Sequence, residues 1–306
     1  MQSRPYKIWL LVLIIPALLV GGCKSNKGKR APGLLDDSET AEIVDRIETI
    51  KQVYHLSPSP AEMLSVIDVA DLSFDTGLLN PRGNMDNYLD TKSRTMGLGV
   101  YITDLAYAAL FGRHEETLDY LEVVRNMAEQ IRVTGAINDE LIEKARKNVE
   151  YIDSLFNISN EAFINMLFFC ERNDRPNTVV ILSAGAFVES LYLAVNLAGD
   201  NGQTDYILQH LADQKYALDN LMTFAESMKE QDPNVAAVIE DMKPIKEIYD
   251  GITVVAGTTT VETEKTAEGQ PKKLVIGGGS KPTLSKREFE KLKKNTIELR
   301  NKLISN

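Results

Sequence analysis

Helix-type patterns separated by Gly and Pro breaks run through most of the chain, and they constrain the fold more than any other feature. Apolar residues recur at helical spacing rather than in strict alternation, which favours α-helices over strands. We expect helices at 41–53, 85–111, 115–133, 139–156, 160–169 (with Ser159 or Asn160 as N-cap), 178–198, 204–229, 233–249 and 286–303. The sequence therefore predicts an all-α fold of roughly seven to nine helices, either a multi-helix bundle or a short array of helical hairpins.

The pattern changes at Gly251. Residues 252–256 and 258–263 are rich in β-branched side chains, and residues 272–276 form a shorter run of the same kind. The polar stretch between the runs, 264–271, is typical of a connecting loop. Together these features predict a small β-hairpin.

A glycine triplet at 277–279 follows the predicted hairpin, without the lysine and hydroxyl residue that a phosphate-binding loop needs at fixed spacing. Ser285 and Glu288 have the spacing of a capping box that begins a final helix. We therefore expect residues 251–306 to contain the β-hairpin and a C-terminal helix, appended to a helical domain at 38–250.

The N-terminus has the arrangement of an export signal. A positively charged start precedes an uncharged apolar run at 8–20, shorter than the roughly 20 residues that span a bilayer. The small pair Gly21-Gly22 then precedes Cys23. This arrangement resembles the lipobox of bacterial lipoproteins. The resemblance implies that residues 1–22 are a removed signal peptide and that Cys23 carries acyl chains such as palmitate. An ordinary membrane anchor with a chance cysteine is the alternative.

Residues 23–37 are expected to be a lipidated, flexible tether. The tether contains a basic cluster of Lys24, Lys27, Lys29 and Arg30 that would also attract anionic headgroups. Lys24, and not an aspartate, follows the cysteine, which by analogy with Gram-negative sorting favours the outer membrane, facing the periplasm. Inner-membrane retention and surface exposure remain open at this point.

Charge and cysteine content narrow the partners further. The chain has a formal net charge of −10, which argues against general nucleic-acid binding. With Cys23 acylated, Cys170 is left without a partner for an internal disulfide, and its apolar surroundings predict a small core residue. The histidines lack metal-ligand spacing, so we expect neither a metal nor a cofactor. They are His55, His114 and His210.

An internal echo links two parts of the helical domain. GVYITDL at 99–105 matches GAFVESL at 185–191, and the match continues without a gap to DYL at 119–121 and DYI at 205–207. We interpret it as a duplicated helical hairpin, at about 85–155 and 175–249. Shared helical periodicity alone is the alternative.

Two resemblances accompany the echo. Residues 107–120 resemble a tetratricopeptide-type helix pair, although Leu105 and Thr117 stand where that family has small residues. This likeness implies a helical-hairpin protein. The mature part as a whole resembles helical lipoproteins of Gram-negative envelopes, which implies no particular activity.

Two acids stand out because they lie within apolar helices. A buried carboxylate must be paired or protonated, so Asp104 and Glu189 predict either a structural ion pair or a ligand-binding acid in a central groove. Arg94 is a candidate partner for Asp104, and Tyr101 is a candidate groove residue. Glu189 also argues against a membrane span at 179–198, since a charge at that depth is costly.

These features predict a membrane-anchored, non-enzymatic scaffold or protein-interaction module that binds an envelope protein. One alternative is a binding protein for a small apolar or amphipathic ligand in the helical core. A second alternative is an enzyme without a recognisable motif. We assign no catalytic residue from the sequence.

Overall fold

The computed structural model describes residues 59–60, 63–64, 72–148, 151–198, 204–256, 260–264, 273–277 and 280–305. All of them belong to one unit, Asp45–Asn306. The predicted signal peptide, Cys23, the tether and the first predicted helix lie outside the described residues.

Two apolar helices form the centre of this unit: α3 (Thr91–Leu110) and α7 (Pro176–Leu197). Most of their side chains are buried, as expected for helices that are apolar on every face. By length and composition α7 is the one described helix able to cross a membrane, but 94% of the tested window is buried inside the protein. Within the described part, α7 is therefore a core helix.

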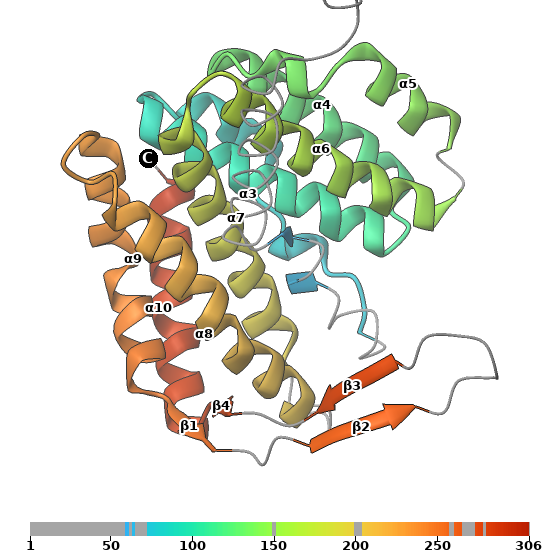
Figure 1. Cartoon of the computed structure of the whole chain (residues 1–306). Coiled ribbons are helices and arrows are strands. Elements are labelled where there is room, and N and C mark those ends of the chain that lie inside the picture. The colour runs from blue at the N-terminus through green and yellow to red at the C-terminus, as the bar shows by residue number, and fades with distance from the viewer. Residues whose placement is uncertain are drawn as a thin grey trace, which may run out of the picture. The chain divides into compact units, whose positions relative to one another are not determined.

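The other helices pack around this central pair in two groups (Figure 1). The first group contacts α3 and comprises α4 (His114–Gln130) and α6 (Ile152–Arg172), with α5 (Asp139–Lys147) against α6. The second group contacts α7 and comprises α8 (Thr204–Glu226), α9 (Pro233–Gly251) and α10 (Lys286–Ile304). Three short 3₁₀ turns lie among the described residues: η1 (Thr76–Leu78), η2 (Arg82–Asn87) and η3 (Thr134–Ala136). Residues 60 and 63–64 are also helical.

Glycine allows α3 and α7 to approach at backbone distance. A Cβ atom on Gly99 would lie 2.1 Å from the Leu182 carbonyl oxygen, and one on Gly185 would lie 2.1 Å from that of Met96. Gly99 and Gly185 are matched positions of the internal echo. Each glycine contacts the carbonyl group of the residue that lies three positions before the other glycine. The two matched glycines therefore lie where α3 and α7 approach each other most closely.

The predicted helix at 85–111 is wrong at its start. Residues 82–87 form the 3₁₀ turn η2, and α3 begins only at Thr91. The cause is a capping box: the Asp90 carboxylate accepts from the Ser93 N–H at 2.9 Å, and the Ser93 hydroxyl accepts from the Asp90 N–H. A capping residue needs a non-helical backbone, which prevents an earlier start.

The predicted helices at 139–156 and 160–169 are also wrong in their boundaries. Helix α5 ends at Lys147, and α6 begins at Ile152 and continues without interruption through Ser159 and Asn160. The Ser159 hydroxyl does not cap a helix but donates to the Phe156 carbonyl within α6, at 2.7 Å. Hydroxyl residues inside helices commonly bond backward in this way.

The predicted all-α class with a small β-hairpin is confirmed. Strands β2 (Thr260–Glu264) and β3 (Lys273–Gly277) pair antiparallel, with Glu262 opposite Val275. A second short pair, β1 (Thr253–Val255) with β4 (Lys281–Thr283), joins this hairpin to α9 and α10. The predicted capping box of Ser285 and Glu288 begins α10.

Candidate functional site

Asp104 and Glu189 meet in the core, between α3 and α7, and both are completely buried. The two helices bring them together because each acid lies about one turn beyond the glycine at the crossing. The cation beside them is Arg300 from α10, which is 4% exposed. Three helices thus contribute one ionisable side chain each to a single buried cluster.

Arg300 binds Glu189 through two hydrogen bonds. Its Nε donates to Oε2 and its Nη2 donates to Oε1, both at 3.1 Å. Nη2 also donates to the Leu78 carbonyl at 3.0 Å, and the guanidinium lies over the Tyr192 ring, 4.3 Å from its centroid. This fork geometry is the strong form of an ion pair, and the extra partners satisfy much of the guanidinium.

Asp104 differs from Glu189 in its surroundings. Its Oδ2 accepts from the Asn80 N–H at 3.0 Å, whereas its buried Oδ1 has no N–H or protein hydroxyl donor. A proton on Asp104, donated to the adjacent Glu189, would satisfy this part of the carboxyl group.

The electrostatics agree with this geometry. Burial, followed by the proximity of Glu189, raises the pKa of Asp104 well above its usual value. Burial also raises the pKa of Glu189, but Arg300 opposes that shift and stabilises the carboxylate. We therefore assign the proton to Asp104 and the negative charge to Glu189, so that the cluster with Arg300 is neutral overall.

Tyrosines and asparagines extend the cluster to the loop before α3. The Tyr120 hydroxyl donates to the Asn80 carbonyl and the Tyr101 hydroxyl to the Pro81 carbonyl, both at 2.8 Å. The Asn80 amide in turn donates to the Tyr88 hydroxyl at 3.0 Å. These bonds fix the loop over α3 and satisfy its buried backbone groups.

The predicted site residues therefore fall into two groups. Asp104, Glu189 and Tyr101 belong to one buried network, whereas Arg94 does not join them, because its Nε donates to the Tyr88 carbonyl at 2.9 Å. Arg94 precedes Asp104 by ten residues, or roughly 15 Å along a helix, which is too far for an arginine side chain to span. The predicted Arg94 partnership is thus wrong, and Arg300 is the cation.

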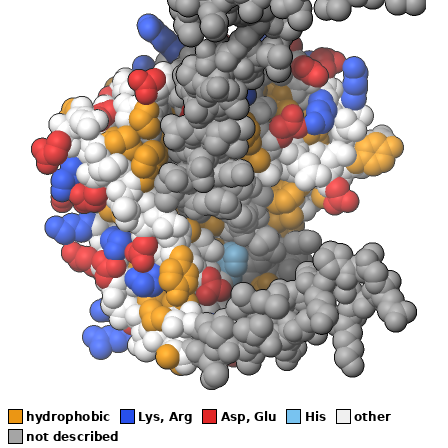
Figure 2. Space-filling view, viewed as in Figure 1, with side chains coloured by type: hydrophobic (Ala, Val, Ile, Leu, Met, Phe, Trp, Pro, Cys, Tyr) orange, Lys and Arg blue, Asp and Glu red, His pale blue; other side chains and the backbone are white. Residues whose placement is uncertain are grey.

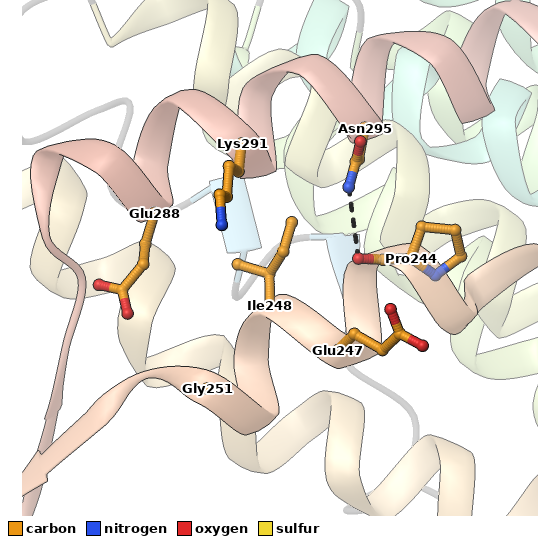
Figure 3. A pocket seen from close by; sticks show the side chains of 7 residues that line it. All are labelled: Pro244, Glu247, Ile248, Gly251, Glu288, Lys291 and Asn295. Carbon is orange, nitrogen blue, oxygen red and sulfur yellow. Dashed lines mark hydrogen bonds between the residues drawn. The ribbon is translucent and has the colours of Figure 1, made fainter.

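Neither of two surface hollows in the described part includes the core acids. One, of about 480 Å³, lies between α9 and α10; Ile248 and Lys291 extend into it, and the Asn295 amide donates to the Pro244 carbonyl (Figure 3). The other, of about 390 Å³, contains Asp241 between Lys92 and Lys302, each at 2.6 Å.

Other residues with potential chemistry are also enclosed. Cys170 is buried, and burial raises the pKa of its thiol to about 11. Within the described ranges, no group of three or more His, Cys, Asp or Glu side chains is arranged to hold a metal ion. Comparison with protein-family models, curated proteins and solved structures finds no match for this chain.

Proposed function

We propose that this chain is a bacterial lipoprotein whose helical domain is a non-enzymatic interaction module, held at a membrane by acylated Cys23. In this proposal the anchor lies in the outer membrane and the domain faces the periplasm. The partner is another envelope protein.

The observation that carries the proposal is the enclosure of the Asp104–Glu189–Arg300 cluster. Catalytic groups must touch a substrate, yet the two acids are fully buried and are bound by groups of the protein itself. Their arrangement ties α3, α7 and α10 together. It favours a rigid body that presents its surface over one that encloses a reacting ligand.

The described surface offers large apolar side chains that have no role in the core. Leu89 is 77% exposed and Tyr151 is 63% exposed. Isolated apolar side chains are common on protein surfaces, but exposed aromatic residues are enriched at protein interfaces. We therefore use these two positions as probes.

Photocrosslinking in cells tests the proposal. A photoreactive amino acid replaces Leu89 or Tyr151 in the full chain, with exposed Lys147 and Glu230 as matched polar positions. We expect crosslinked adducts with an envelope protein at one or both apolar positions and not at the controls. Recovery of this chain alone at all four positions would contradict the interaction module.

The anchor is tested separately by the mass of the N-terminal peptide. We expect an acylated cysteine at position 23, and loss of the protein from the membrane fraction in Cys23→Ala. An N-terminus without acyl chains would contradict the lipoprotein assignment. It would not change what the crosslinking experiment says about the interaction module.

A further inference from the structure

The last part of the chain is basic although the whole chain is acidic. Residues 281–302 contain eight basic and three acidic side chains, whereas the formal net charge of the chain is −10. Arg300 is buried in the core cluster, but most of the other cations are on the surface. Positive charge is thus concentrated on β4 and along α10.

Four of these cations have no acidic partner. Lys281, Lys286, Arg287 and Lys291 are exposed, and they take part in none of the ion pairs formed among the described residues. In contrast, Lys302 pairs with Asp241 at 2.6 Å.

The acids near these cations reduce the positive charge only in part. The Glu288 carboxylate is bound by the backbone N–H of Ser285 as the helix cap. Asp250 is bound by Lys246. Glu290 and Glu247 are exposed and remain as opposing charges, and Glu247 lines the same hollow as Lys291. The beginning of α10 therefore presents more free cations than free acids.

Exposed apolar side chains adjoin the cations. Val254 is 42% exposed and Val255 is 51% exposed, and the strand register places Val255 opposite Lys281. The β1–β4 pair lies at the N-terminal end of α10, whose first residues are Lys286 and Arg287 (Figure 1). Valine side chains and unpaired cations thus share one end of the described unit.

Helix α8 fixes the outer edge of this strand pair. The Gln209 amide donates to the Pro282 carbonyl at 3.1 Å, and the Tyr216 hydroxyl donates to the Ser280 carbonyl at 3.3 Å. The Tyr216 side chain is itself 48% exposed. Hydrophobic and charged side chains are both visible on the face shown in Figure 2, which includes the α8 side of the molecule. The strand pair is therefore bonded to α8 through both Ser280 and Pro282.

We propose that this end of the domain, made of Val254, Val255, Tyr216, Lys281, Lys286 and Arg287, binds the surface of an anionic lipid bilayer. Tyrosine favours the boundary between headgroups and acyl chains, and valine adds apolar area that can be buried there. Unpaired cations are attracted to anionic headgroups. The inference rests on the proposed lipid anchor, because a tether that holds the domain near a membrane makes a weak second contact effective. The second contact orients the domain on the membrane.

Fluorescence of a single environment-sensitive probe tests this contact in the full, lipidated chain. The probe is attached at Val254→Cys, with Lys147→Cys on α5 as the matched exposed control. Cys170 is buried and does not compete for the label. The chain is reconstituted into vesicles of phosphatidylethanolamine with phosphatidylglycerol, or of phosphatidylcholine alone.

We expect blue-shifted, brighter emission from the probe at position 254 in the anionic vesicles, little change in phosphatidylcholine, and none at position 147. Neutralising Lys281, Lys286 and Arg287 together to glutamine should weaken the contact by about a hundredfold, since each cation near an anionic surface contributes roughly fivefold. The matched triple variant Lys147→Gln, Arg172→Gln and Lys243→Gln should leave the contact unchanged.

Three results would overturn the proposal. They are equal emission in both vesicle types, equal effects of the two triple variants, and burial of the probe at position 254 by self-association without lipid. The last result would assign this end to a second copy of the chain. The mass of the N-terminal peptide shows independently whether Cys23 is acylated, and therefore whether the proposed lipid anchor exists.

Discussion

Gly99 and Gly185 lie against each other's helix backbone where α3 crosses α7. Either Cβ atom would sit 2.1 Å from a carbonyl oxygen of the facing helix, which no side-chain movement can relieve. This close approach brings Asp104 and Glu189 together one turn later. The geometry of the buried cluster thus depends on two residues that have no side chain.

Gly99→Ala and Gly185→Ala should each destabilise the fold by about 3 kcal/mol or more, because the two helices must separate to admit a methyl group. Urea unfolding measures the loss. Gly251→Ala is the matched control, since a Cβ atom there meets nothing within 4 Å and should change stability by less than about 1 kcal/mol. Equal effects of Gly99→Ala and Gly251→Ala would contradict the close crossing.

Arg300→Met should lower the free energy of unfolding by about 3–5 kcal/mol, because it leaves the carboxylate of Glu189 buried without its cation. Lys302→Met on the same helix should lower the free energy of unfolding by about 1 kcal/mol or less, since the Lys302 side chain is 60% exposed and Asp241 keeps Lys92 as a second cation. The double variant Glu189→Gln with Arg300→Met should recover part of the loss. If the double variant is no better than Arg300→Met, the coupling between these residues is refuted.

The proton on Asp104 predicts a specific pH dependence. An unfolded Asp loses its proton above about pH 4. Between that pH and the higher folded-state pKa, the native state binds more protons than the unfolded state, so the free energy of unfolding falls as pH rises. The slope should approach about 1.4 kcal/mol per pH unit.

Asp104→Asn should remove this slope, because an amide keeps its protons and can still donate to Glu189. Asp241→Asn is a useful contrast, because Asp241 should affect the pH dependence of the free energy of unfolding in the opposite direction. Although burial opposes them, Lys302 and Lys92 lower the pKa of Asp241, so this carboxylate stabilises the fold at neutral pH and loses that effect on acidification. Urea unfolding over a pH series distinguishes the two variants, and identical profiles would refute the assigned proton.

Cys170 should react with thiol reagents only after unfolding. Burial both shields its sulfur and raises its pKa to about 11, so almost none is thiolate at neutral pH. We expect native labelling to be slow and to accelerate with urea along the unfolding curve. Rapid labelling of the native chain, as fast as that of Val254→Cys, would show that this part of α6 is accessible.

Sequence patterns predicted the fold class because apolar periodicity and helix caps are local signals. The α10 start followed directly from the spacing of Ser285 and Glu288. The start of α3 was missed because its capping box uses Asp90 with Ser93, where a serine replaces the usual Glu or Gln.

The cluster was predictable only in part. Asp104 and Glu189 were recognisable as acids within apolar helices, but nothing local identified their cation, which lies 111 residues beyond Glu189. One signal for Arg300 was present, because it occupies the apolar stripe of α10, four residues after the buried Thr296 and eight after the buried Leu292. The partnership itself depends on tertiary packing.

The most direct test of the account is the infrared spectrum of the native chain at neutral pH, because the structural role of the cluster rests on a protonated, solvent-excluded carboxyl at Asp104. Difference spectra between the wild type and Asp104→Asn isolate the C=O stretch of that group. We predict a protonated-carboxyl band that is present in the wild type and absent from Asp104→Asn. A wild-type spectrum with only carboxylate bands would show that Asp104 is charged and would contradict the buried, neutral cluster described above.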